Sequence, residues 1–111
     1  MKPIEIKNAI INTTYLGIDD HGIMTCFLHL DYGASGQSFG GYFLDEYNKV
    51  QKQRVGIAFG MNFIISILKT LNITSWEMLK GKHIRVKASF EKIHAIGHIL
   101  EDKWFYPEDI L

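Results

Sequence analysis

The chain has 111 residues, 47% of them hydrophobic, which suits one domain with its own core and leaves little material for a second. Twelve basic and twelve acidic residues cancel, so no global field would draw the protein to nucleic acid or to an anionic membrane. The single cysteine, Cys26, excludes an internal disulfide, and every apolar run is far shorter than the roughly 20 residues of a membrane span. We therefore expect one domain, residues 1–111, in a reducing cytoplasm.

Three extended segments are predicted before residue 45. Ile4–Ile18 is rich in isoleucine, threonine and tyrosine, which favour strands. Asp19–Gly22 has the residues of a turn, and Ile23–Asp31 then alternates apolar and polar side chains with the period of a strand. Ser38–Leu44 resumes extended structure after a second turn. We expect these three strands to form an antiparallel meander.

The middle of the chain is predicted to contain the main helix. Asp45–Gly56 is polar and is interpreted as a loop. In Ile57–Leu71 the apolar side chains cover about 200° of a helix surface, whereas a half-buried helix needs about 100°. Either this helix is sunk in its own core or part of it contacts another subunit. A capping-box pattern, Thr74 with Glu77, then predicts a short helical turn over Ser75–Leu79.

The segment His83–Leu100 is predicted to form a β-ribbon with one charged face. With a turn at Glu91–Lys92, Arg85 lies opposite His98. Four side chains then share the face away from the core: Arg85, Lys87, His94 and His98. Like charges across strands destabilise a sheet unless something compensates for them. A bound anion, neighbouring carboxylates or water could do so. The expected fold is α+β, an antiparallel sheet of about five strands with one main helix and a short helical turn.

The motifs of common enzymes are absent from the sequence. Gly33–Gln37 lacks the second glycine of a nucleophile elbow, and no dinucleotide-binding or P-loop pattern occurs. His94 and His98 have the spacing of a helical zinc pair, but in a strand they would lie about 13 Å apart. We therefore expect no catalytic residue, no metal and no cofactor, and leave the role of His21 open.

The stretch Gly36–Asp45 combines glycines with aromatic residues. Gly40 and Gly41 indicate a bulge or sharp bend in a strand, or a place where a ligand approaches the backbone closely. Phe39, Tyr42 and Trp104 could stack on a base or could belong to the core. Arg54 has the planar fork that suits phosphate.

Three blocks of the sequence carry a resemblance. DDHGIMTCFLHLDYGASGQSFGGY within Leu16–Tyr42, together with LKGKHIRVKA and HAIGHILEDKWF, resembles a group of small proteins encoded by phages and prophages. In size, setting and α+β layout the chain is similar to the Thoeris anti-defence family, small phage proteins that sequester a cyclic ADP-ribose signal between subunits. The resemblance implies a homo-oligomer, a dimer or a hexamer, that captures a nucleotide without cleaving it.

Residues and resemblance together predict a phage anti-defence protein of the host cytoplasm that binds a small cyclic nucleotide, and neither nucleic acid nor a membrane. The expected ligand-binding residues are Phe39, Gly40, Gly41, Tyr42, Arg54, Arg85, Lys87, His94, His98 and Trp104. The alternative is a phage inhibitor that acts by protein contact on a host enzyme, such as an anti-CRISPR or host-takeover factor.

Overall fold

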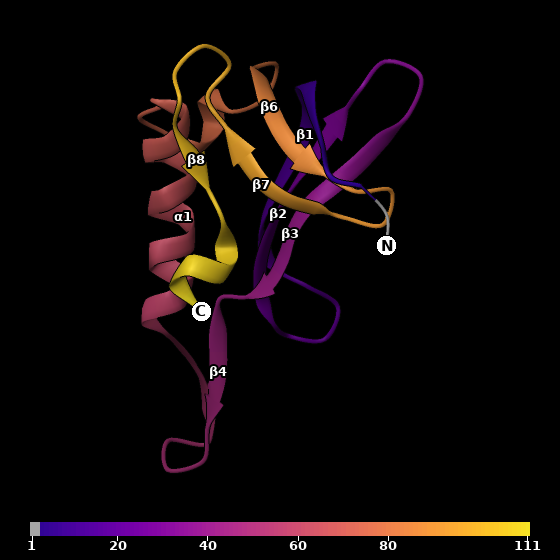
Figure 1. Ribbon diagram of the computed structural model, residues 1–111. Helices are drawn as coiled ribbons and strands as arrows, with labels where there is room; N and C mark the ends of the chain where they lie inside the picture. The colour runs from indigo at the N-terminus through magenta and orange to yellow at the C-terminus, as the bar shows by residue number, and fades with distance from the viewer. Residues whose placement is uncertain (1–2) are drawn as a thin grey trace.

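A computed structural model describes residues 3–111 (Figure 1). It confirms the predicted α+β class. The main sheet has six antiparallel strands in the order β3-β2-β1-β6-β7-β8, and β4 and β5 form a separate two-stranded sheet. The elements are β1 (Glu5–Ile18), β2 (Met24–Asp31), β3 (Gly36–Phe43), β4 (Asp45–Asn48), β5 (Gln53–Gly56), α1 (Ala58–Leu71), a 3-10 turn (Trp76–Met78), β6 (His83–Ala88), β7 (Ile93–Gly97), β8 (Trp104–Phe105) and a second 3-10 turn (Pro107–Ile110).

The long strand β1 organises the sheet. Its first half, Glu5 to Ile10, pairs with β6, and its second half, Ile10 to Ile18, pairs with β2. A bulge at Asn12 lies within the second half, where the pairing with β2 shifts by one residue. The predicted meander of β1, β2 and β3 is confirmed, and α1 connects it to β6.

The helix α1 lies beside the tail strand β8, which forms one edge of the curved sheet (Figure 1). Phe63 of α1 is fully buried and stacks on Phe39 of β3 at 5.7 Å between ring centroids, while Phe105 of β8 meets it edge-on at 5.3 Å. Full burial of such a side chain contributes about 1.5–3 kcal/mol. The wide apolar surface of α1 is thus largely core, although Met61 and Ile65 remain exposed.

Residues 45–56 were predicted as a loop, and that prediction is wrong. They form the hairpin β4–β5, which projects from the body of the protein and is called the arm below (Figure 1). At its base Arg54 donates two hydrogen bonds to the carboxylate of Asp45, from Nε to Oδ2 at 3.0 Å and from Nη2 to Oδ1 at 2.8 Å. The arm explains why the radius of gyration, 14.6 Å, exceeds the about 13 Å expected of a compact chain this long.

The capping box predicted at Thr74 does not form. The short helical turn exists, but its N-cap is Ser75 and no side chain caps it. The hydroxyl of Thr74 instead donates to the sulfur of Met78 at 3.6 Å. A turn of only three residues, Trp76–Met78, cannot bring a third-position glutamate back to the cap as a full helical turn does.

The register predicted for the last β-ribbon is off by one residue. Arg85 pairs with Gly97 rather than with His98, and Lys87 pairs with Ala95. The register shifts after this pair, so that His94 is an extra residue on β7. Because β7 ends at Gly97, His98 lies beyond the pairing.

In residues 3–111, no helix is both long and apolar enough to cross a membrane.

Candidate functional site

Two of the four predicted cationic or imidazole side chains meet the indole ring of Trp104. Trp104 lies flat over Gly97, where an added Cβ would stand only 2.5 Å from the indole Cε3. The guanidinium carbon of Arg85 is 4.9 Å from the indole centroid, and the Nζ of Lys87 is 4.3 Å from it. Lys87 is also 5.0 Å from the ring centroid of Tyr106. We call Arg85, Lys87, Trp104 and Tyr106 the clamp.

Hydrogen bonds hold the two cations of the clamp in place. Arg85 donates from Nε to the carbonyl of His98 and from Nη2 to the carbonyl of Glu101, both at 2.8 Å. Lys87 donates to the hydroxyl of Tyr106. Within residues 3–111, neither cation has a carboxylate oxygen at ion-pair distance. Aromatic faces and backbone carbonyls therefore stabilise the two cations. Because neither partner carries a full negative charge, the clamp remains positively charged.

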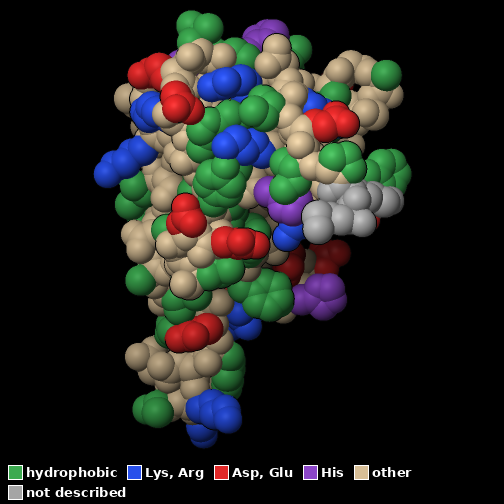
Figure 2. Space-filling model, in the orientation of Figure 1, with side chains coloured by type: hydrophobic (Ala, Val, Ile, Leu, Met, Phe, Trp, Pro, Cys, Tyr) green, Lys and Arg blue, Asp and Glu red, His purple; other side chains and the backbone are tan. Residues whose placement is uncertain are grey.

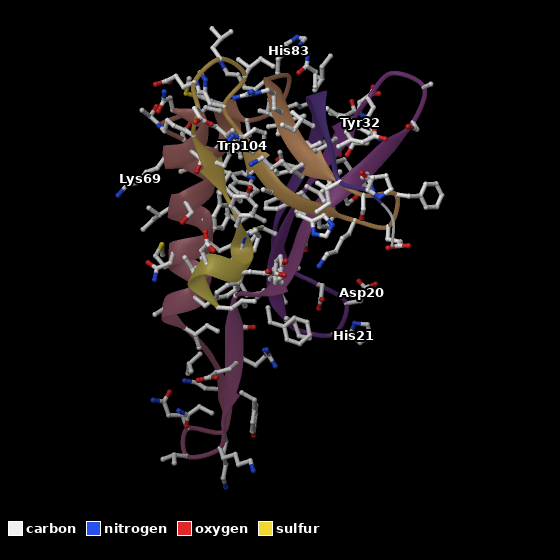
Figure 3. All side chains as sticks on the ribbon, viewed as in Figure 1. Asp20, His21, Tyr32, Lys69, His83 and Trp104 are labelled. Atoms are coloured by element: carbon white, nitrogen blue, oxygen red, sulfur yellow. The ribbon has the colours of Figure 1, made fainter. Side chains whose placement is uncertain are left out.

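Lys and Arg side chains alternate with hydrophobic ones over β7 and β8 on the face seen in Figure 2. The indole of Trp104 sits among these strands in Figure 3. Its Nε1 donates to the carboxylate of Asp102 at 3.1 Å, which fixes the ring from its far edge. All four clamp side chains are half-buried, so they are accessible from solvent on one side.

The two histidines of the predicted face are engaged elsewhere. The Nδ1 of His98 accepts hydrogen bonds from the backbone of Leu100 and Glu101, and its Nε2 is 3.3 Å from the Glu101 carboxylate. His94 lies at the bulge of β7, where its Nε2 is 3.2 Å from the hydroxyl of Ser89. His98 thus adjoins the clamp through its carbonyl, whereas the ring of His94 belongs to the β6–β7 turn.

The glycine-aromatic stretch forms a bulge over the core. Gly40 has φ +115°, and a Cβ there would stand 2.5 Å from the carbonyl oxygen of Cys26. Gly41 has φ +82°. Phe39 points inward and is 2% exposed, and Tyr42 packs on Phe63 at 5.2 Å between centroids. The bend that these glycines suggested is present, and it approaches the protein's own strand β2.

Arg54 stands apart from the clamp, at the base of the arm. Its hydrogen bonds to Asp45 lower the pKa of that carboxyl below the usual 3.8 and raise the pKa of the guanidinium. The Nε and Nη2 donors of Arg54 are therefore used in a structural ion pair with Asp45. His21 lies exposed in the turn between β1 and β2, well away from Trp104 in Figure 3. The ten predicted residues are thus divided among the clamp, the β6–β7 turn, the core and the arm.

The chain was also compared with known proteins. No protein-family model, curated protein or solved structure matches it. A search of the described residues 3–111 found no cluster of histidine, cysteine and acidic side chains able to hold a metal ion.

A second group of side chains, not singled out in the sequence, lies on the outer face of β1, β2 and β3. Tyr15 and Phe27 stack at 5.4 Å between centroids, and Phe27 meets the ring of His29 edge-on at 5.2 Å. The Nδ1 of His29 is 2.8 Å from the hydroxyl of Ser38 on β3. The alternation in Ile23–Asp31 already placed Phe27 and His29 opposite the core side chains, so this signal was available in the sequence.

Beside this group the surface is hollowed. The hollow has a volume of about 680 Å³, within the range of about 300–1,000 Å³ that is usual for ligand sites. Side chains and backbone of β1, β2, β3 and the β2–β3 loop line it, among them Asn12, Thr13, His29, Asp31, Ser35 and Ser38.

Proposed function

We propose that this protein binds a small cyclic nucleotide, of the cyclic ADP-ribose type, at the clamp and sequesters it without cleaving it, as a phage anti-defence protein of the host cytoplasm. One observation carries the proposal. Arg85 and Lys87 share a single indole ring, and within residues 3–111 no carboxylate pairs with either. Two adjacent cations in this state attract an anion, and phosphate is the anion that arginine matches best.

The arrangement of the clamp favours binding of a phosphate at a defined position. The carbonyls of His98 and Glu101 fix the guanidinium of Arg85 through Nε and Nη2, which leaves Nη1 for a ligand. The ammonium of Lys87 has three donors, of which Tyr106 uses one. A preorganised pair of this kind loses little conformational entropy when a ligand binds.

Binding without turnover agrees with the side chains present. Ser38 and His29 are within hydrogen-bond distance, as a nucleophile and its base would be. However, the hydrogen bonds of residues 3–111 include no third group that orients His29, and the pair stands on an open sheet face. A serine activated for attack normally has a base held by such a third group.

Isothermal titration calorimetry on the purified full-length protein tests the proposal. Cyclic ADP-ribose isomers and a cyclic dinucleotide should bind. Lys87→Gln should weaken binding by about 10- to 150-fold, because a hydrogen bond to a charged group contributes about 1.5–3 kcal/mol. Lys49→Gln, in the exposed turn of the arm, is the matched control and should bind normally. Native mass spectrometry would give the subunit count, which we propose to be that of a dimer or hexamer. Absence of heat with every nucleotide would refute the function.

A second candidate function is inhibition of a host enzyme by protein contact. The arm favours it, because Tyr47 and Val50 on the arm are 55% and 91% exposed and Phe43 at its base is 59% exposed. Apolar side chains on a projecting hairpin are typical of surfaces that dock on another protein. Co-purification from host cells tests this candidate. It is favoured over the first if a host protein co-purifies with the wild type but not with Val50→Asp, and if no nucleotide is extracted from the protein.

A further inference from the structure

We propose that the hollow on the outer face of β1–β3 binds an uncharged, hydroxyl-rich ring: a sugar, either free or as the ribose of a nucleoside. The hollow lies on other strands than the clamp, so the inference does not depend on the proposed function.

The floor of the hollow is a row of hydrogen-bonding side chains across three strands. Thr13 of β1 pairs with His29 of β2, and His29 pairs with Ser38 of β3. Because these residues are paired in register, their side chains emerge side by side on the same face. The bulge at Asn12 adds an amide next to Thr13, since a bulge brings an extra side chain to a sheet face. Hydroxyl, imidazole and amide groups in one row can donate and accept, as the hydroxyls of a sugar require.

One wall of the hollow is the β2–β3 loop, which its own hydrogen bonds hold in shape. The Oδ1 of Asp31 accepts from the backbone of Gly33 at 2.7 Å, and the backbone of Tyr32 donates to the carbonyl of Ser35 at 2.8 Å. Among the hydrogen bonds recorded for residues 3–111, Oδ2 of Asp31 has no partner. A carboxylate with one oxygen fixed by the backbone and the other directed to solvent is suited to accept a hydrogen bond from a ligand hydroxyl.

The charge of the hollow selects against phosphates. Asp31 is its one acidic lining residue, and no lysine or arginine of residues 3–111 lines it. A phosphate placed here would face a carboxylate without a lysine or arginine to compensate it, which is unfavourable at short range. The aromatic pair Tyr15–Phe27 contacts His29 but lies outside the lining of the hollow. Hydroxyl, imidazole, amide and carboxylate groups without a lysine or arginine match a neutral sugar.

Two-dimensional ¹H–¹⁵N NMR of the full-length protein tests this site, with methyl glucoside, adenosine and AMP as probes. Probe concentrations of up to about 20 mM allow dissociation constants in the millimolar range to be detected. The amides of residues 12–13, 29–31 and 33–38 should shift with at least one neutral probe. Shifts with methyl glucoside would assign the site to pyranoses, and shifts with adenosine to ribose. AMP should shift the same amides with an about tenfold weaker affinity than adenosine.

Matched variants make the test specific. Asp31→Asn should bring AMP to within about threefold of adenosine, whereas Asp20→Asn in the exposed β1–β2 turn should leave the difference unchanged. Ser38→Ala should weaken the neutral ligand, and Lys87→Gln should not. If neither neutral probe moves the hollow amides, or if AMP binds there as tightly as adenosine, the inference is overturned. Because the shifts are read at the hollow, this result stands whether or not the clamp binds a nucleotide.

Discussion

Replacing Gly97 by alanine perturbs the contact on which the clamp is built. An added Cβ would lie 2.5, 2.7 and 2.8 Å from the Cε3, Cδ2 and Cζ3 atoms of Trp104. Favourable carbon contacts need about 3.5–4.0 Å, so the indole must move by about 1 Å. A ring is rigid, so the movement also changes its contacts with Arg85 and Lys87. Overpacking of this kind costs about 1–3 kcal/mol, more than the about 0.4–1 kcal/mol that alanine gains by restricting the unfolded chain.

Urea unfolding, followed by tryptophan fluorescence and circular dichroism, measures this effect. Gly97→Ala should lower the free energy of unfolding by about 1–2 kcal/mol net, or the melting temperature by several degrees, about 4 °C per kcal/mol. Gly56→Ala is the control, because no atom lies within 4 Å of a Cβ at that exposed strand position. In a Trp104→Ala background the cost of Gly97→Ala should vanish, giving a coupling energy of at least about 1 kcal/mol. An equal cost in both backgrounds would refute the stacked geometry.

Three further predictions concern the arm, the thiol and the start of α1. Arg54→Ala should speed amide exchange in the arm but not in the main sheet. Since the pKa of Asp45 is lowered in the fold, chiefly by Arg54 and also by the backbone N–H of Met24, its stabilising effect is present above pH 3.8, is lost as pH falls through the folded value, and should be smaller in the variant. Burial raises the pKa of the Cys26 thiol to about 12, so a thiol reagent at neutral pH should label it only after unfolding, and rapid labelling of the native protein would contradict this. Gly60→Ala would place a Cβ 2.2 Å from the carbonyl oxygen of Leu44, and we expect a loss of about 3 kcal/mol by urea unfolding; an unchanged midpoint would show that α1 does not begin against this carbonyl.

Much of the main sheet is predictable because one of its faces is buried. In β2, Cys26, Leu28 and Leu30 are at most 2% exposed and alternate with more accessible residues, which is the pattern from which the strand was predicted. The arm has no such pattern. Its residues are exposed or half-buried throughout, so neither the period of a strand nor that of a helix is visible. The pairing of Arg54 with Asp45, nine positions apart, stabilises it and cannot be read from periodicity.

The candidate site was harder to predict because it depends on register. A turn of two residues at Glu91–Lys92 would have placed Arg85 opposite His98. Instead, Ala88 pairs with Ile93, so the turn spans Ser89–Lys92, and the bulge at His94 then sets Gly97 opposite Arg85. Only a glycine there leaves room for the indole of Trp104. A one-residue shift of this kind depends on packing between distant segments. The sequence therefore identified the cations and the tryptophan, but not the contact between them.

The contacts that stabilise the two neighbouring cations of the clamp, Arg85 and Lys87, have known magnitudes. Hydrogen bonds from a charged donor contribute about 1.5–3 kcal/mol each, and a cation–π contact about 0.5–2 kcal/mol. These values suffice to hold Arg85 and Lys87 in place without a ligand. The two cations nevertheless differ, because Arg85 is tied to two backbone carbonyls and Lys87 to one flexible tyrosine hydroxyl. A phosphate can displace the tyrosine without disturbing the backbone, so Lys87 is the group expected to exchange its partner when a nucleotide binds, while Arg85 keeps its position and adds a contact through Nη1.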